Sequence, residues 1–411
     1  MVSKLSSIFL AAAVLGTAFL GAISSRTLLE EEGRLSRGPE TLAIKASSPV
    51  DTERSGDLVR LLRRQLLRSE PWGPDRRLHR AAWTVLRYTE GLDGAQVDGV
   101  LEEAFDGEGV FDTLVFPVEA WSESLEDAIL SISDALSGDL NSTSFNRLGI
   151  AAEKVQRGWR VLTLVANRRV EINAHARAIQ PGGNFELRGL LTEAKSEAEV
   201  LVLSPDGRIF EVDTWIKGMT LGADIPLDKP GEYRIEVLLH DKDRSPEIPA
   251  ALFTLHCGDK VPVASGGEGL PRFRLHPSGS VQGNLTHATT QEIWTRSDRL
   301  RAHRGLSHLN RDKKLEQIAY QHARYLAEKR TLAHVDSSGR GPFERVRSGG
   351  IRASSIGENV AAGLSAEGIQ TSLERSPSHL QQLLRSDVTR MGVGTAIRDG
   401  VVFVVQLFAG P

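Results

Sequence analysis

Residues 355–379 of the chain read SIGENVAAGLSAEGIQTSLERSPSH. Three polar side chains mark the edges of this stretch: Glu358 and Asn359 near its start and His379 at its end. A carboxylate, an amide and an imidazole can together hold a metal, act on a substrate, or cap and pin a fold. The surrounding sequence is needed to distinguish these roles.

The end of the stretch has the residues of a helix start. Ser376 is a favoured N-cap residue, and Pro377 suits the first helical position. His379 is then expected in the first helical turn, where the positive end of the helix dipole disfavours the imidazolium. A ring kept neutral in this way can serve as a metal ligand or as a base.

Other short motifs surround this stretch in a fixed order. Leu332-Ala333-His334 precedes it, and the runs 391–394 (MGVG) and 401–408 (VVFVVQLF) follow it. With the Gly-Glu-Asn box and Ser-Pro-x-His, the ordered set resembles the CAP superfamily in its cysteine-free bacterial form. This family includes cysteine-rich secretory proteins, insect venom antigen 5 and plant pathogenesis-related proteins. The resemblance covers residues 295–411, under a third of the chain.

The resemblance implies an α-β-α sandwich with a central antiparallel sheet and an open cleft. In many members the cleft holds two histidines and two acids that can bind a divalent metal, often zinc. By motif, His334 and His379 match the two histidines and Glu358 matches the acid of the Gly-Glu-Asn box. Two imidazoles and a carboxylate are a sufficient set for Zn²⁺ with a water in the fourth position. Such a water could act as a nucleophile.

The second acid departs from the family pattern. Where members have it, it follows a Trp by a few residues; here Leu373 stands in the place of the Trp and Ser376 in the place of the acid. Glu374 is close but out of register, and it is kept as a candidate. The candidate cleft residues are therefore His334, Glu358, Asn359, Glu374 and His379.

Structural roles compete with a metal site at each position. Asn359 could close a turn through side-chain to backbone bonds, and Glu358 could accept hydrogen bonds from buried amides or from a histidine. His379 could bond within the helix cap, and His334 could be an exposed loop residue. His322, on the preceding helix, is expected on the solvated face of that helix.

The composition is that of an ordinary globular protein. The 411 residues are 40% apolar and 25% charged, with a formal net charge of −3. Such a length allows two or three domains, and the charge excludes a nucleic-acid binder. Cys257 is the only cysteine, so no intrachain disulfide can form. It is most simply a buried small residue.

The first residues have the features of an export signal. Lys4 precedes an apolar run over residues 8–23, and small residues, Ala22 and Ser24, stand before a cleavage point. The run is shorter than the ~20 residues of a spanning helix, so a cleaved signal over residues 1–24 is preferred, with an inner-membrane anchor as the alternative. A bacterial protein of the periplasm, the cell surface or the extracellular space is expected.

The rest of the chain divides by its pattern. A charged linker over residues 25–56 precedes an α/β region over 57–174. This region ends in two strand-like runs that are expected to form a hairpin at Arg157-Gly158. Short alternating strands over 178–258 predict an antiparallel, Ig-like β-sandwich. A Gly-, Pro- and Ser-rich linker spans 259–290. Helices, with short ones expected over residues 361–384, and a closing hairpin make 291–411 the CAP-like domain. The fold class is therefore α+β.

The first and last regions resemble each other. RRLHRAAWTVLRY (76–88) and KKLEQIAYQHARY (313–325) share a Leu, an Ala, an Arg and a Tyr at one constant offset. Further on, NRLGIAAEKVQRG and TRMGVGTAIRDG align Gly149 with Gly392. This similarity predicts a degenerate CAP-like repeat on the other side of the sandwich, with chance as the alternative.

Two functions fit these observations. The preferred one is a non-catalytic protein that binds a lipid, a glycan or another protein at the cell envelope or outside the cell. A metal-dependent hydrolase or peptidase using His334, His379 and Glu358, with zinc as cofactor, is the alternative. No Ser-His-Asp arrangement is legible, and the missing second acid removes one general base. No nucleic acid is expected as a partner, and a membrane only through an uncleaved N-terminal segment.

Overall fold

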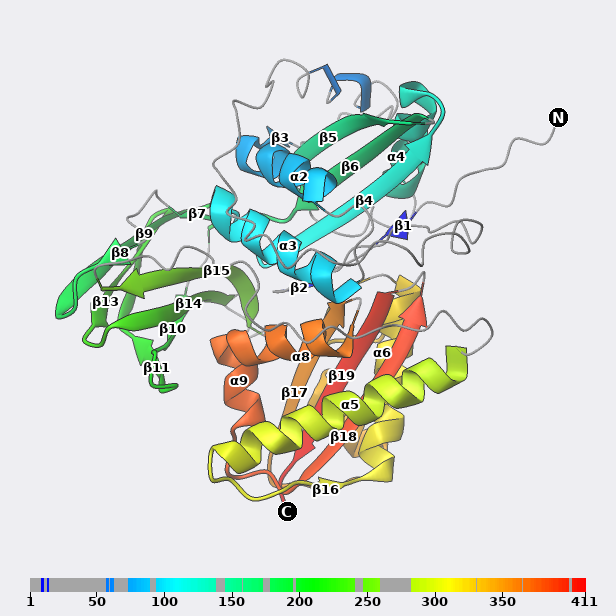
Figure 1. Ribbon diagram of the computed structural model, residues 1–411. Coiled ribbons are helices and arrows are strands. Elements are labelled where there is room, and N and C mark those ends of the chain that lie inside the picture. The colour runs from blue at the N-terminus through cyan, green and yellow to red at the C-terminus, as the bar shows by residue number, and fades with distance from the viewer. Residues whose placement is uncertain are drawn as a thin grey trace, which may run out of the picture.

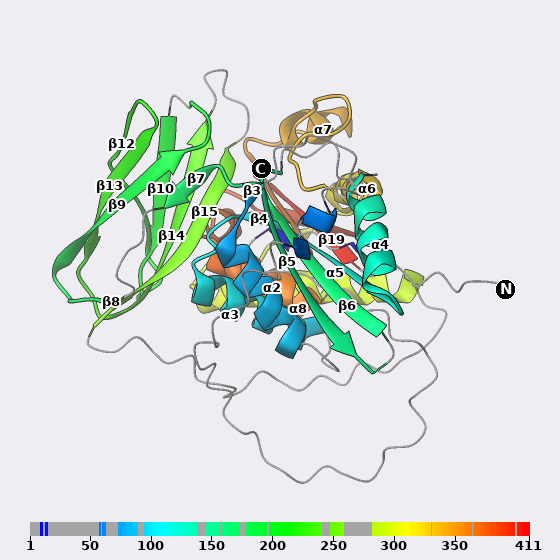
Figure 2. The same cartoon turned by 90° about the horizontal axis from the view of Figure 1, so that it is seen from above.

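A computed structural model describes three parts of the chain, of which the first lies over the third while the second stands beside both (Figure 1 and Figure 2). The described residues are 9–10, 13–14, 57–58, 60–62, 73–88, 94–137, 145–156, 158–172, 178–194, 197–240, 247–258, 282–329, 331–363, 365–398 and 401–411. The predicted cleavage point after Ser24, the linker 25–56 and most of the linker 259–290 lie outside them. No helix within the described residues is both long and apolar enough to cross a membrane.

The first part is a sheet with helices on both faces. Its elements are β1 (Phe9–Leu10), β2 (Ala13–Val14), β3 (Gly73–Pro74), α2 (Arg76–Tyr88), α3 (Gly94–Glu108), β4 (Leu114–Ser122), α4 (Leu125–Ser137), β5 (Arg147–Val155) and β6 (Gly158–Ala166). The strand order is β1-β4-β6-β5-β3. α2 and α3 pack on one face and α4 on the other, because alternate residues of β5 and β6 enter two separate cores. β5 and β6 form the hairpin that the sequence predicts.

The second part, residues 170–258, consists of two sheets around one core and is called the sandwich below. One sheet contains β8 (Ala178–Ile179), β10 (Glu197–Leu203), β11 (Ile209–Val212), β14 (Gly231–His240) and β15 (Ile248–Cys257). The other contains β7 (Val170–Ile172), β9 (Gly183–Leu191), β12 (Thr214–Lys217) and β13 (Thr220–Leu227). Both sheets contribute to the core, which includes the buried Cys257. β7 pairs with β9, so the sandwich begins inside the region predicted as 57–174.

The third part has helices on both sides of a central sheet. Its elements are α5 (Gln282–His303), β16 (Asn310–Arg311), α6 (Lys313–Lys329), α7 (Pro342–Ser348), β17 (Ile356–Gly363), α8 (Ala366–Arg375), α9 (Pro377–Leu383), β18 (Arg390–Arg398) and β19 (Val401–Ala409). The strand order is β16-β18-β19-β17. α6 and α7 share a core with one face, and α5, α8 and α9 with the other. This is the α-β-α arrangement that the sequence predicts.

Two boundaries differ from the sequence-based prediction. α5 begins at Gln282, inside the predicted linker 259–290. The sequence predicts short helices from Ala361 onward, whereas β17 continues to Gly363. The small residues of β17 are buried on both faces of the sheet, so the run has no two-residue alternation by which a strand could be identified.

The sheets of the first and third parts have the same core order. The order β4-β6-β5-β3 in the first part corresponds to β17-β19-β18-β16 in the third part. The short strands β3 and β16 each pair parallel to their neighbours, β5 and β18. In both, a glycine of the sheet lies against the backbone of a covering helix. A Cβ added to Gly149 would come 2.3 Å from the carbonyl carbon of Leu78, and one added to Gly392 would come 2.4 Å from that of Leu315. The two glycines aligned in the sequence therefore have the same packing role.

Polar contacts connect the three parts. In the first part, the buried Arg168 pairs with Asp112 (2.8 Å) and Asp75, while Leu252 of the sandwich donates its amide to the carbonyl of Phe111 (2.9 Å). Glu102 of α3 pairs with an arginine of each of the other two parts, Arg234 of the sandwich and Arg375 of the third part. The parts therefore pack against one another through the described residues.

Candidate functional site

Glu358 lies at the centre of a cluster of charged groups on one face of the third part. It projects from β17, His334 lies in the segment between α6 and α7, and Arg345 is on α7. His334 Nδ1 is 2.9 Å from Glu358 Oε1, and Arg345 pairs with Glu358 Oε2. Arg345 also donates to the carbonyl of His334 (3.3 Å). Both carboxylate oxygens of Glu358, whose side chain is 1% exposed, are therefore engaged.

His322 of α6 belongs to the same cluster, although the sequence predicts it on the solvated face. Its ring is buried, and Nε2 lies 2.8 Å from the carbonyl oxygen of Ala333. Burial lowers the pKa of His322, and the nearby Glu358 works against this shift. The stripe of apolar residues at three- and four-residue spacing along α6 includes position 322, which is the signal that could have placed it.

Asn359 points to the opposite face of the sheet, because successive residues of a strand alternate. Its Nδ2 donates to the carbonyl oxygen of His379 (3.1 Å) and to Gln406 Oε1 (3.0 Å). Asn359 is fully buried in a strand and so does not close a turn. It fixes the start of α9 to the sheet.

His379 lies in the first turn of α9, as the sequence predicts. Ser376 is the N-cap, and Pro377 follows it. The His379 Nδ1 is 2.7 Å from Ser376 Oγ, and the ring also bonds the backbone of Val360 on the edge strand β17. Burial, with a smaller contribution from His334, lowers the pKa of His379 to about 3. The ring is therefore neutral, and its Nδ1 is held by Ser376.

The sandwich contributes a further acid, Glu236, which sequence reasoning missed. Glu236 Oε1 lies 2.9 Å from Ser376 Oγ, and Oε2 accepts from the amide of Ser378 (2.8 Å). Burial raises the pKa of Glu236 to about 7, and the bonds from Ser378 and Ser376 lower it. Glu236 stands between the apolar residues Ile235 and Val237, which was a weak signal, but its partner could not be read from the sequence.

The structure separates the remaining candidates. Leu373 is in the core, and Glu374 accepts from Gln370 Nε2 (2.9 Å) instead of joining the cluster. Among the described residues, one group brings three ligand atoms within 4.8 Å of one another, and it is Glu199, His240 and Glu247 of the sandwich. The predicted set of His334, Glu358 and His379 is not such a group. Its geometry does not fit one metal shared by the three side chains.

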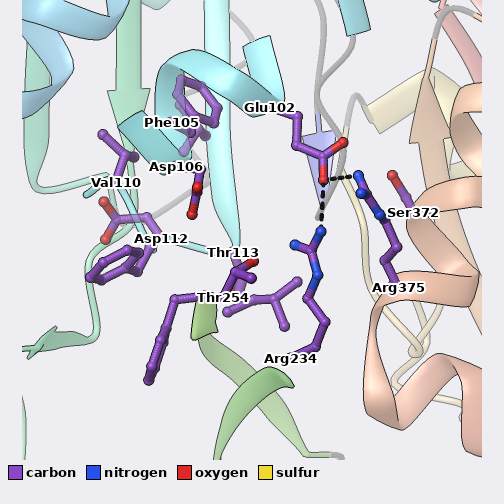
Figure 3. A pocket seen from close by; sticks show the side chains of 14 residues that line it. Glu102, Phe105, Asp106, Val110, Asp112, Thr113, Arg234, Thr254, Ser372 and Arg375 are labelled. Carbon is purple, nitrogen blue, oxygen red and sulfur yellow. Dashed lines mark hydrogen bonds and ion pairs between the residues drawn. The ribbon is translucent and has the colours of Figure 1, made fainter. Parts of the chain in front are cut away.

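Two cavities lie where the parts meet. Figure 3 shows the first, of about 70 Å³, where Glu102 pairs with Arg234 and Arg375. It is large enough to hold water. The second, of about 340 Å³, lies between the sandwich and the third part, and its lining includes Arg304 and Glu374. That volume falls within the range of small-molecule sites.

The family match found for this chain lies in the third part. Residues 295–408 match the model of the cysteine-rich secretory protein family (CAP). An outer surface protein from Borrelia burgdorferi is 26% identical, with 30% of this chain and 94% of that chain covered and a TM-score of 0.29. An extracellular protein containing a SCP domain from Bacillus anthracis is 15% identical, with 59% and 67% covered and a TM-score of 0.29.

A cysteine-rich secretory protein from Staphylococcus aureus is 12% identical, with 55% of this chain and 77% of that chain covered and a TM-score of 0.27. A search of curated proteins gave no match. The family match falls on the same residues that form the α-β-α layers and carry the Gly-Glu-Asn box. The C-terminal part of this chain is a CAP superfamily domain.

Proposed function

We propose that the chain is an exported, non-catalytic binding protein that presents its CAP domain at the cell envelope or outside the cell. One observation carries the proposal: both oxygens of Glu358 are already engaged, one by His334 and one by Arg345. A general base or a metal ligand needs a lone pair that points at its target, and each of these two contacts directs one lone pair of its oxygen elsewhere. The Arg345 guanidinium also supplies the positive charge that a metal would bring to a buried carboxylate.

His379 supports the same proposal. Its ring is buried, and its Nδ1 lies 2.7 Å from the hydroxyl of Ser376. His334 is the accessible member of the cluster, with its side chain 30% exposed. We therefore place ligand contact at the His334 side of the cleft, and a lipid, a glycan or a protein surface as the ligand class.

The first part is proposed to be a degenerate CAP-like repeat. The shared strand order and the equivalent packing of Gly149 and Gly392 support this origin. The segment from residue 80 to residue 174 contains no histidine, and the first region has no Gly-Glu-Asn box. We propose that this part serves as a scaffold for the sandwich and the CAP domain.

A zinc titration tests the non-catalytic proposal. Isothermal titration of the purified protein with ZnCl₂ at pH 7.5 is expected to show no stoichiometric event that depends on the cleft. The comparison is the His334→Ala, His379→Ala double variant. A one-to-one event that this variant loses, accompanied by hydrolysis of casein or an ester substrate, would establish the hydrolase instead.

Ligand binding is measured directly with defined probes. Phosphatidylglycerol and phosphatidylcholine vesicles, a glycan array and envelope extracts of a bacterium cover the three ligand classes. The His334→Ala variant is expected to weaken the binding at least several-fold, while His308→Ala, at a histidine with a 73% exposed side chain, leaves it unchanged. Equal binding by both variants would remove the cleft from the proposal.

A further inference from the structure

One strand of the sandwich faces two environments. On β14, Tyr233, Ile235 and Val237 enter the core of the sandwich. The residues between them face outward: Arg234 reaches Glu102 of the first part. Glu236 points to the CAP domain and is fully buried there. A carboxyl group is rarely placed in such a position without a bonded partner.

Glu236, Ser376 and His379 form a continuous chain of hydrogen bonds. The distances are 2.9 Å from Glu236 Oε1 to Ser376 Oγ and 2.7 Å from Ser376 Oγ to His379 Nδ1. A serine hydroxyl has a single proton, which it can donate in one direction only. If Ser376 donates to His379, the neighbouring acid must donate to Ser376 and so must be protonated. If the acid is ionised, it accepts the hydrogen bond that Ser376 donates, and Nδ1 of His379 has to donate to the oxygen of Ser376.

We propose that Glu236 is a positioning residue for His379: through the hydroxyl of Ser376, its protonation state sets which ring nitrogen of His379 carries the hydrogen. The sandwich thereby controls the hydrogen bonding of a residue in another domain. This link is a property of the folded chain and holds whether or not the cleft binds a ligand.

The burial of Glu236 places its ionisation within the physiological range. Burial raises the pKa of Glu236 to about 7; the charge of Glu247 adds to this, and the bonds from Ser376 and Ser378 oppose it. Arg234, two residues away on β14, is paired with Glu102 and Glu232. No ion pair joins Glu236 to any residue that the structure describes.

The test is nitrogen NMR of the full protein with ¹⁵N-labelled histidine between pH 5.5 and 8.5, in which His379→Gln assigns the signals. In the wild type, the ¹⁵N chemical shifts of Nδ1 and Nε2 of His379 are expected to change with pH, with a midpoint near 7. One nitrogen should change from the shift of a protonated nitrogen to that of an unprotonated one, and the other in the opposite sense, while the ring stays neutral. Glu236→Gln, whose amide mimics the protonated acid, should hold one tautomer at every pH. Shifts that do not change with pH, or that change equally in Glu236→Gln, would overturn the proposal.

Two further variants keep the test decisive if Glu236→Gln does not fold. Glu247→Gln removes the neighbouring charge and is expected to lower the midpoint while the exchange of tautomers remains. Ser376→Ala breaks the chain of bonds, and the shifts of His379 should then no longer respond to pH. A response of His379 to pH that persists in Ser376→Ala would contradict the link.

Discussion

The hydroxyl of Ser376 lies 2.9 Å from the carboxylate of Glu236, although 140 residues separate the two in the sequence. The contact joins the first turn of α9 to the outer face of β14. His379, which the Ser-Pro-x-His motif brings to this turn, therefore depends on a residue that lies outside the CAP domain. The arrangement of the cleft is a property of two parts of the chain together.

Removing the cation beside Glu358 should destabilise the fold strongly. Arg345→Met leaves a carboxylate that is almost fully buried without its ionic partner. Loss of one partner of a buried ion pair costs about 3–5 kcal/mol. Urea unfolding checks this, with Arg347→Met on the exposed side of the same helix as control. Similar stabilities for the two variants would show that Glu358 does not need Arg345.

The two equivalent glycines should not tolerate a side chain. A Cβ at Gly392 would come 2.3 Å from the backbone nitrogen of Glu316, and one at Gly149 would meet Leu78 equally closely. Each Gly→Ala change is expected to cost roughly 3 kcal/mol, because backbone has to move.

Gly107 provides a matched control for this prediction. It lies in α3 with nothing within 4 Å of an added Cβ. Gly107→Ala should stabilise the protein by about 0.5–1 kcal/mol, since alanine favours the helix. Thermal unfolding measures whether each alanine raises or lowers the stability. An alanine at Gly392 that leaves the stability unchanged would contradict the packing of this glycine against α6.

Two groups of ion pairs should differ greatly in strength: one lies within the first part and the other joins the parts. Arg168 is buried among Asp112 and Asp75, so Arg168→Met is expected to cost about 3–5 kcal/mol. Glu102 and Arg375 are 35% and 41% exposed, so Glu102→Gln should cost at most about 1 kcal/mol. Denaturant unfolding of both variants measures the difference, and comparable losses would refute it.

His379 should make the folded state less stable in acid. Its pKa falls from 6.5 to about 3 on folding, so above pH 6.5 the ring is neutral in both states and has no effect. Between pH 6.5 and about 3 the unfolded chain binds a proton that the folded chain does not. Stability is then lost as the pH falls, by about 1.4 kcal/mol per pH unit.

A comparison of variants isolates this contribution. Between pH 7 and pH 5 the wild type should lose about 2 kcal/mol more unfolding free energy than His379→Gln. His308→Gln, at an exposed position, should follow the wild type. Parallel pH profiles for the wild type and His379→Gln would mean that the ring takes up a proton in the folded state.

The features that could be predicted from the sequence are the local ones. The N-cap Ser376 with Pro377 and the hairpin at Gly158 each depend on neighbouring residues, and both are present in the structure. The order of the CAP motifs indicated the α-β-α layers of the C-terminal part. β17 was missed beyond Val360 because its small residues carry no distinctive period.

The partners of the site residues could not be predicted, because they come from distant segments. Nothing near Glu358 in the sequence indicates that Arg345 of α7 takes one of its oxygens. Glu358 and Asn359 are adjacent in the motif, yet strand geometry sends them to opposite faces of the sheet. Only the pairing of the strands shows which histidine each of them meets.

The long sequence separation between Glu236 and Ser376 also constrains the order of folding. Contacts between distant segments form late, since the chain must first close a large loop. During synthesis the sandwich can assemble before α9 has been made. Glu236 is then exposed to solvent, where a carboxyl group is ionised at neutral pH. When the CAP domain docks, burial favours the neutral form. Docking should therefore take up a proton and proceed more readily in mildly acidic surroundings.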